Sequence, residues 1–157
     1  MIFSGKRVWV TGKGMVGKAL ITKLEEMNIE VFSETKKNLD LRNQSNVRDF
    51  LKSHKPDFIF QTAAKVGGIY ANSKFPANFI YDNLAIQSNI IHEAHSLDID
   101  HLVSLGSSCV YPKESPQPIK EEYLLSGPLE ETNQWYAVAK IAGAKMAEAY
   151  QKQYNRN

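Results

Sequence analysis

Three side chains in the second half of the sequence have the types and spacing that suit proton transfer to a carbonyl group. Tyr136 and Lys140 are four residues apart, which on a helix places them on one face, and Ser107 precedes Tyr136 by 29 residues. A free tyrosine with a pKa of about 10 exchanges protons poorly at neutral pH, and a neighbouring ammonium group lowers that pKa. We therefore expect Lys140 to activate Tyr136, and Ser107 to hydrogen-bond a substrate carbonyl oxygen. The alternative is a helix-face tyrosine beside a solvated lysine.

A second pair with the same spacing, Tyr70 and Lys74, occurs earlier in the chain. Because the chain contains seven tyrosines and many lysines, a match to Tyr-x-x-x-Lys arises easily by chance. The segment around Tyr70 has the character of a loop, and no serine-rich strand end precedes it. We interpret this pair as a chance match.

Cys109 is the single cysteine and lies two residues after Ser107, beyond a predicted strand. A thiol titrates close enough to neutral pH to exchange protons beside a carbonyl, so Cys109 is a candidate acid/base. The alternative is an inert buried thiol. The four histidines have no metal-ligand spacing with cysteine or acidic residues, and the sequence therefore predicts no metal site.

Gly12, Gly14 and Gly17 form the pattern G-x-G-x-x-G between a strand-like and a helical segment. In a dinucleotide-binding turn the first glycine makes the bend, and the second lets the backbone approach a pyrophosphate. The third glycine lets helix and strand pack closely, and amides of the helix N-terminus face the phosphates. The pattern predicts that this turn, with Met15 and Val16, binds a dinucleotide. The alternative is a turn that only connects a strand to a helix.

The charges after the second predicted strand give conflicting indications about the dinucleotide. Glu34 lies 17 residues after Gly17, where an acid would bind the ribose 2′-hydroxyl of NAD. Lys36 and Lys37 follow it and suit the 2′-phosphate of NADP. All three can equally be solvated loop charges. The residues by themselves leave NAD and NADP open.

The elements that must position these side chains alternate along the chain. Apolar and β-branched runs predict strands and helical spacing predicts helices, with a Pro- and Glu-rich loop over 111–135. The expected strands are 6–11, 29–33, 58–64 and 101–105, and the expected helices are 15–27, 46–54, 76–97 and 136–154. This alternation predicts an α/β fold with a doubly wound parallel sheet, Rossmann-like, with right-handed crossovers. We expect one NAD(P)-binding domain over residues 1–157.

Composition narrows the class of protein. Hydrophobic residues at 43% and charged residues at 23% are ordinary for a soluble globular chain. A net charge of +2 without a basic tract argues against nucleic acid as a partner. No apolar run approaches the ~20 residues that span a membrane, and no signal peptide precedes the first strand. One cysteine fits a reducing compartment, so we expect a cytoplasmic protein without membrane partners.

Three segments carry a resemblance to a known family: Ala63–Ile69 (AAKVGGI), Gly106–Pro112 (GSSCVYP) and Tyr136–Lys140 (YAVAK). With them, nearly the whole chain resembles the GDP-L-fucose synthases, which are extended short-chain dehydrogenases/reductases of the NAD-dependent epimerase/dehydratase family. The resemblance implies 3,5-epimerisation of GDP-4-keto-6-deoxymannose followed by reduction of its 4-ketone, with NADP as the cofactor and NAD as the alternative. The cysteine at 109 favours this family over UDP-hexose 4-epimerases, which usually carry threonine there.

The resemblance also implies a role for individual residues. Ser107, Tyr136 and Lys140 would form the reductase triad, and Cys109 would be an acid/base of the epimerisation. Besides the glycine turn and Lys140, the implied cofactor contacts are Lys36 near the 2′-phosphate, Asp40 and Leu41 at the adenine, and Ala63 and Ala64 beside the cofactor.

Two departures from the family pattern shape the remaining expectations. The family's turn usually reads G-x-x-G-x-x-G, one residue longer than the turn here. Family members also continue for about as many residues again, and that part carries a second epimerisation acid/base and most of the sugar-nucleotide pocket. We therefore expect a chain that is truncated before the C-terminal substrate-binding domain and inactive by itself. The expected partners are a nucleotide-sugar substrate and a second copy of the chain in a homodimer. The alternative to an enzyme is a non-catalytic dinucleotide-binding module.

Overall fold

The structure, a computed structural model, describes residues 3–156. Within that stretch the chain forms two compact units. The first unit comprises residues 3–63, 85–105 and 146–156, and the second comprises residues 64–84 and 106–145. Two long helices, α4 (Pro76–Ser96) and α5 (Gln134–Tyr154), contribute residues to both units. None of the helices within residues 3–156 has the length and apolar character needed to span a membrane.

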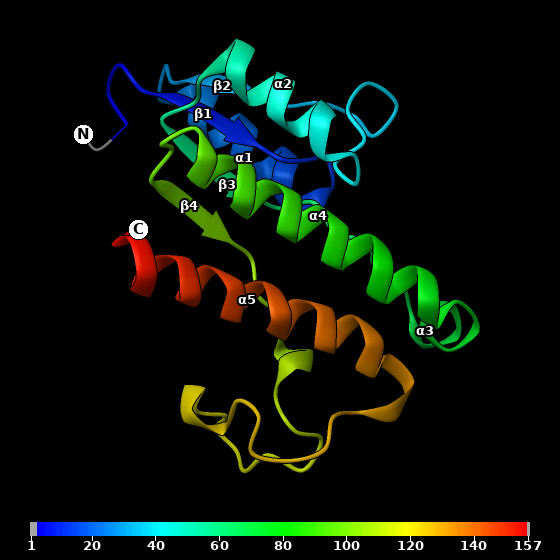
Figure 1. The fold of residues 1–157 in the computed structure, drawn as a ribbon. Helices are drawn as coiled ribbons and strands as arrows, with labels where there is room; N and C mark the ends of the chain where they lie inside the picture. Colours follow the sequence, from blue (N-terminus) through cyan, green and yellow to red (C-terminus); the bar gives the residue numbers. More distant parts are fainter. Residues whose placement is uncertain (1–2, 157) are drawn as a thin grey trace. The chain divides into compact units, whose positions relative to one another are not determined.

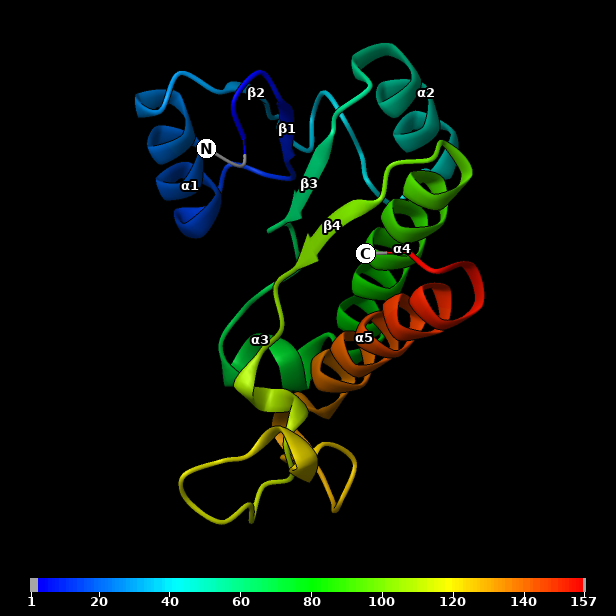
Figure 2. The same ribbon diagram turned by 90° about the vertical axis from the view of Figure 1, so that its left-hand side faces the viewer.

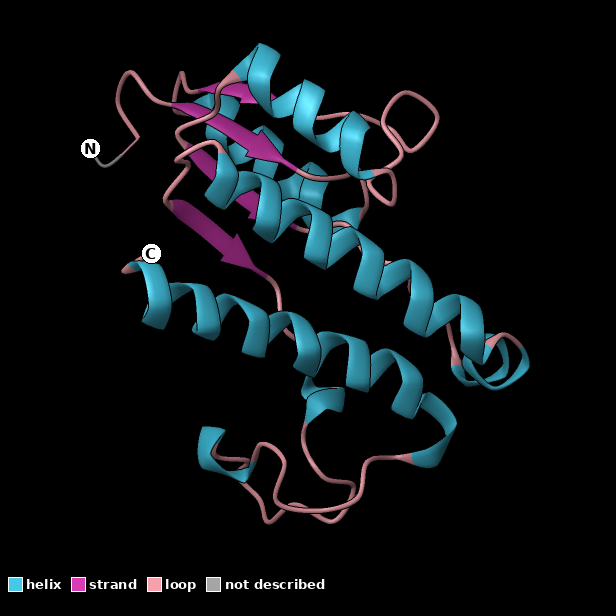
Figure 3. Ribbon diagram, in the orientation of Figure 1, coloured by secondary structure: helices cyan, strands magenta, loops and turns pink. Residues whose placement is uncertain are grey.

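The first unit contains a parallel sheet of four strands in the order β2-β1-β3-β4 (Figures 1 and 3). The strands are β1 (Arg7–Val10), β2 (Glu30–Phe32), β3 (Phe58–Gln61) and β4 (His101–Ser104). In the register of the sheet, Trp9 on β1 is paired with Phe32 on one side and Ile59 on the other. The chain passes from β1 to β2 and then returns past β1 to β3, so the winding reverses between β1 and β3. This confirms the doubly wound, Rossmann-like fold.

Helices cover both faces of this sheet (Figure 2). Val8 and Val10 point to one face, where Leu24 of α1 (Met15–Glu26) packs against them. Trp9 points to the opposite face, because side chains alternate along a strand. There α2 (Gln44–His54) and the second half of α4 complete a core of Trp9, Leu39, Val47, Leu51, Ile59, Ile90 and Ala94. Burial of these apolar side chains is the main source of stability in such a core.

The second unit combines helical segments with irregular chain. It contains α3 (Ile69–Lys74), the beginnings of α4 and α5, and the 3₁₀ turns η1 (Ser108–Val110), η2 (Glu121–Tyr123) and η3 (Glu131–Asn133). The expectation that Tyr70 lies in a loop is wrong, because it belongs to α3. The predicted 111–135 loop contains η2 and η3, and α5 begins at Gln134. The predicted strands and the other helices are present, with ends shifted by up to three residues.

Candidate active site

The glycine turn lies where β1 and β3 end, at the point where the winding of the sheet reverses. Gly12 has a φ of +87°, and a Cβ on it would lie 3.1 Å from the Cβ of Ala63. A side chain here would therefore be strained as well as crowded. A Cβ on Gly14 would meet no heavy atom of the described residues within 4 Å. The backbone at Gly14 is thus open on the side where a side chain would lie, as the close approach of a pyrophosphate requires.

Two threonines hold the glycine turn against the end of β3. The hydroxyl of the buried Thr11 accepts hydrogen bonds from the backbone N–H groups of Thr62 (3.1 Å) and Ala63 (3.0 Å). The Thr62 hydroxyl donates to the Thr11 carbonyl, and a Cβ on Gly17 would collide with the Gly12 carbonyl and crowd this hydroxyl. Sequence reasoning missed both threonines, although each follows one of two neighbouring strands.

The residues expected at the adenosine end lie in the segment that follows β2. Arg42 donates from Nε and Nη2 to the Asp40 carboxylate, at 2.9 and 2.6 Å. These bonds, with a smaller contribution from the charge of Lys36, hold the pKa of Asp40 at about 2. Lys36 itself is exposed, and Leu41 packs against the apolar core. Sequence reasoning missed Arg42, which makes Asp40 part of an ion pair.

In the second unit, Ser107, Cys109 and Tyr136 lie together. The Ser107 hydroxyl oxygen accepts a hydrogen bond from the Cys109 backbone N–H at 3.3 Å, which caps η1. Ser107 also lies close enough to the side chain of Tyr136 to act on its pKa. Lys140 lies one turn further along α5, and it is only 5% exposed. The structure thus assembles the predicted serine, cysteine and tyrosine and adds a buried lysine beside them on the same helix.

Burial sets the acid strengths in this cluster. It raises the pKa of Tyr136; the hydrogen bond with Ser107 opposes that rise, and the nearby Cys109 adds to it. Burial also lowers the pKa of Lys140. Desolvation disfavours the charged form of each group, the phenolate and the ammonium. The expectation that Lys140 lowers the pKa of Tyr136 is therefore wrong for this structure, and the phenol is protonated at neutral pH.

Two buried asparagines fix the loop that follows Ala63 and Ala64. Asn83 accepts from the Lys65 backbone N–H at 2.8 Å and donates to the Lys65 carbonyl at 3.0 Å. Asn72 donates to the carbonyls of Gly67 and Gly68, at 2.8 and 3.1 Å. Sequence reasoning gave neither asparagine a role, because a side chain that holds a distant loop leaves no periodic signal.

Asn133, to which the sequence analysis assigned no role, contacts the thiol of Cys109. No group of three or more His, Cys, Asp or Glu side chains within residues 3–156 is arranged to hold a metal ion. The histidines take part in packing instead. His92 shares a hydrogen bond with the Tyr150 hydroxyl, and His101 stacks on Phe58.

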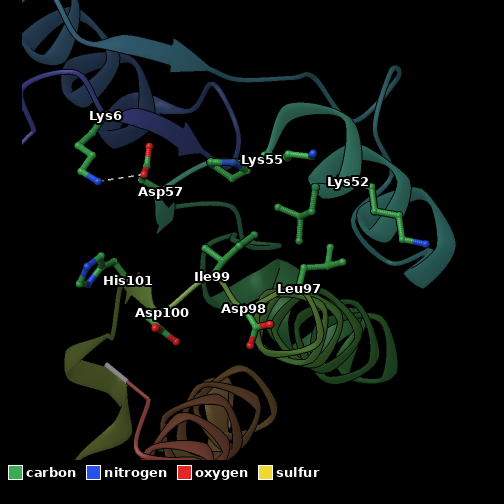
Figure 4. Close-up of a pocket in the computed structure, with 11 residues that line it drawn as sticks. Lys6, Lys52, Lys55, Asp57, Leu97, Asp98, Ile99, Asp100 and His101 are labelled. Carbon is green, nitrogen blue, oxygen red and sulfur yellow. Dashed lines mark hydrogen bonds and ion pairs between the residues drawn. The ribbon is translucent and has the colours of Figure 1, made fainter.

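A cavity of about 540 Å³ lies at the amino ends of β3 and β4 (Figure 4). The glycine turn, in contrast, follows the carboxyl end of β1. Its lining mixes both signs of charge. Lys6 pairs with Asp57 at 3.1 Å, and Asp98 pairs with Arg156 at 2.7 Å. None of the predicted site residues lines it, so we assign it no role in the chemistry.

Comparison with known proteins identifies the family. Residues 8–157 match the model of the NAD dependent epimerase/dehydratase family. The chain belongs to this family. The match covers the glycine turn and the Ser107 cluster, so both parts of the candidate site lie in the segment that defines membership.

Individual relatives within the epimerase/dehydratase family narrow the comparison. The chain is 51% identical over 157 residues to a GDP-L-fucose synthase of Sinorhizobium fredii, covering 99% of this chain and 50% of the relative. It is 49% identical to the GDP-L-fucose synthase of Escherichia coli over 156 residues, 98% of this chain and 49% of the relative. A Campylobacter jejuni GDP-mannoheptose C4 reductase solved with NADP bound has a TM-score of 0.93 at 40% identity, covering 97% of this chain and 49% of that one. The chain therefore spans about half the length of the relatives it matches.

Proposed function

We propose that this chain is the cofactor-binding and proton-transferring part of an NADP-dependent GDP-sugar epimerase/reductase similar to the GDP-L-fucose synthases. The observation that carries the proposal is the meeting of Ser107, Cys109 and Tyr136 one helical turn from the buried Lys140. An acid, a second acid/base and a carbonyl-binding hydroxyl are the groups that this pair of reactions needs. The names of the relatives, GDP-L-fucose synthases and a GDP-mannoheptose C4 reductase, support a GDP-sugar as substrate.

For the reduction, bound NADPH would supply the hydride that adds to the 4-keto carbon. The Ser107 hydroxyl donates a hydrogen bond to the ketone oxygen and holds the carbonyl in place. Tyr136 then transfers its phenolic proton to the same oxygen as negative charge develops there. The raised pKa of Tyr136 suits this role, since the phenol carries its proton at neutral pH. Lys140 hydrogen-bonds the nicotinamide ribose.

In the epimerisation, Cys109 acts on a carbon next to the ketone. Its thiolate takes the proton, so that an S–H bond forms as the C–H bond breaks and the electron pair moves to the ketone oxygen. Ser107 stabilises that oxygen. A proton returned to the opposite face of the carbon completes the inversion. The resemblance to the GDP-L-fucose synthases implies that a second acid/base, in the part of the relatives that this chain does not span, donates that proton.

The cofactor contacts come from the first unit and from the residues that follow β3. We propose that the amides of Met15 and Val16 and the open backbone at Gly12, Gly14 and Gly17 hold the pyrophosphate. The exposed Lys36 binds the 2′-phosphate, which favours NADP over NAD. Asp40 and Leu41 lie at the adenine, and Ala63 and Ala64 lie beside the dinucleotide.

The proposal also includes a single NAD(P)-binding domain over residues 1–157, a cytoplasmic location and a homodimer. The lone free thiol supports the location. Exposed apolar side chains on α4 and α5 in the second unit, Tyr81, Leu84, Trp135 and Val138, support self-association. Light scattering coupled to gel filtration of the purified chain tests the homodimer, and a monomer across the concentration range would contradict it.

Calorimetric titration of the purified chain with NADPH and NADH in parallel tests the proposed cofactor. We expect NADPH to bind more tightly, with Lys36→Ala removing the difference and Lys18→Ala, a charge elsewhere in the first unit, preserving it. Equal affinities would contradict the role of Lys36, and tighter NADH binding would favour a UDP-hexose 4-epimerase. No binding of either would contradict a working glycine turn.

A fusion of this chain to the remaining half of the Escherichia coli relative tests the reaction. We expect the fusion to consume NADPH with GDP-4-keto-6-deoxymannose, and the 157-residue chain alone to bind NADPH without turnover. A folded fusion that binds NADPH but converts no GDP-keto-sugar would favour the alternative, a non-catalytic dinucleotide-binding module.

A further inference from the structure

The thiol of Cys109 is held by a side chain distant in the sequence. The Nδ2 group of Asn133 donates a hydrogen bond to the Cys109 sulfur, with a nitrogen–sulfur distance of 3.0 Å in a partly buried environment. An N–H donor stabilises a thiolate more than a neutral thiol, because the acceptor then carries a full negative charge. The contact therefore favours the form of Cys109 that can accept a proton.

Both partners are fixed by their own turns. Asn133 is the last residue of η3, which is capped by Glu130 through bonds from the N–H and hydroxyl of Thr132. The Asn133 backbone N–H also bonds to the Glu130 carbonyl at 3.2 Å, and η3 packs against α3. Cys109 lies in η1, which is capped by Ser107. The distance between amide and sulfur is thus set by two separately built turns, so the contact is preorganised.

The other polar atom of the Asn133 side chain does not account for its orientation. Its Oδ1 is buried and has no hydrogen-bond partner among the described residues. Among the described residues, this side chain forms its hydrogen bond with the Cys109 sulfur, and the donor is the amide nitrogen.

Cys109 and Tyr136 compete for negative charge. Burial raises the pKa of Tyr136, and the nearby Cys109 adds to that rise by disfavouring the phenolate. Two neighbouring anions repel each other in a partly buried site. Stabilising the charge on sulfur therefore helps to keep the proton on the phenol.

We propose that Asn133 is a positioning residue whose amide holds the sulfur of Cys109 and stabilises the thiolate that takes the proton in the epimerisation. The catalytic importance of this contact rests on the proposed function, in which Cys109 and Tyr136 each carry out one of the two proton transfers. Its physical core, the effect of the amide on the thiol, can be tested without turnover.

The single cysteine makes that test direct, because iodoacetamide can alkylate only Cys109. The second-order alkylation rate of the folded chain is measured from about pH 6 to 10 for wild type, Asn133→Ala and Asn133→Asp. We expect Asn133→Ala to lower the rate at pH 7 by about tenfold and to move the midpoint of the profile to higher pH by about one unit. Asn133→Asp keeps the size of the side chain but replaces the donor with a negative charge, so the rate should fall further.

Gln134→Ala is the matched control. Gln134 is the next residue, and its side chain donates to the Glu131 carbonyl rather than to sulfur. Its pH profile should match wild type. In urea all variants should alkylate at one rate, which separates an effect of the fold from one of local sequence. Wild-type rates or faster ones in both Asn133 variants would overturn the proposal.

NADPH titration of the same variants separates this proposal from the proposed function. Asn133→Ala should bind NADPH like wild type, since the amide contacts a thiol and not the glycine turn. If wild type fails to bind NADPH while the alkylation profiles shift as expected, the proposed function fails and the effect of Asn133 on Cys109 stands. If NADPH binds and the profiles do not shift, Asn133 has no such role.

Discussion

The two Tyr-x-x-x-Lys pairs of the second unit share a spacing and differ in everything around it. On α3, Tyr70 is 74% exposed, and the Lys74 ammonium donates to its hydroxyl at 3.1 Å. On α5, Tyr136 is partly buried near Ser107, and Lys140 is 5% exposed. Burial shifts the pKa of Tyr136 upward and that of Lys140 downward. The spacing makes both pairs neighbours, but the α5 pair differs in its burial and in the third side chain, Ser107, beside its tyrosine.

The comparison shows why a spacing motif is a weak indicator by itself. Any helix brings residues i and i+4 together, and at the surface water screens their interaction. Removing water strengthens electrostatic effects and changes which protonation state is stable. The serine that distinguishes the α5 pair comes from a segment almost thirty residues earlier, which the fold returns to the helix.

The largest expected difference between the pairs is in turnover. In the fusion with the Escherichia coli half, Tyr136→Phe removes the proton donor and should lower kcat for ketone reduction by about 10²–10⁴. Tyr70→Phe removes the matching hydroxyl from the exposed pair and should leave kcat unchanged. Initial rates of NADPH consumption measure both, and an equal loss in the two variants would erase the distinction.

The two lysine variants should differ in their Kd for NADPH, by a smaller factor than the two tyrosine variants differ in kcat. Lys140→Met removes the proposed contact to the nicotinamide ribose, and the Kd for NADPH should rise by about ten- to a hundredfold. Lys74→Met should change it by less than about twofold. Calorimetric titration gives both values, with circular dichroism to confirm that each variant is folded. An unchanged Kd for NADPH in Lys140→Met would show that Lys140 does not contact the cofactor.

The pH dependence of stability should also differ between the lysines. The folded state lowers the pKa of Lys140 below its ordinary value near 10.4, so between the two values the unfolded chain binds more protons. The free energy of unfolding should therefore rise with pH in that window, by about 1.4 kcal/mol for each unit of pKa depression.

Urea unfolding at several pH values above 7 measures this rise. Lys140→Met should remove it, while Lys74→Met should run parallel to wild type. The raised pKa of Tyr136 acts in the opposite direction above pH ~10, since the folded state then holds its proton more tightly. That contribution is common to all three proteins and cancels in their differences. A rise that persists in Lys140→Met would assign it to another group.

The smallest expected effect is the coupling within the exposed pair. A double-mutant cycle of Tyr70→Phe and Lys74→Met should give a coupling free energy of about 0.5 kcal/mol or less, despite the 3.1 Å hydrogen bond. Chemical denaturation of the four proteins measures it. A coupling well above 1 kcal/mol would mean that exposure does not weaken the pair, and the contrast with α5 would lose its basis.

Local patterns in the sequence were enough for much of the fold and for the identity of several site residues. The apolar residues of each strand and long helix recur at a spacing that indicates the buried face. The G-x-G-x-x-G pattern requires glycines at defined points of a turn. Ser107, Cys109 and Tyr136 were chosen by residue type and order along the chain, and the structure places them together. Their catalytic roles stay predictions that the experiments above test.

What only the tertiary structure decided is the environment of those residues. Burial reversed the expected direction of the pKa of Tyr136, and burial depends on contacts between distant segments. Asn133 reaches Cys109 across 24 residues, and Asn83 and Asn72 hold the loop after Ala64. Asparagine side chains that bind one distant atom have no periodicity and no fixed spacing. The sequence by itself thus determined which chemical groups are present and on which elements, because those follow from local patterns. Their protonation and their partners depend on desolvation and long-range packing, which only the folded chain defines.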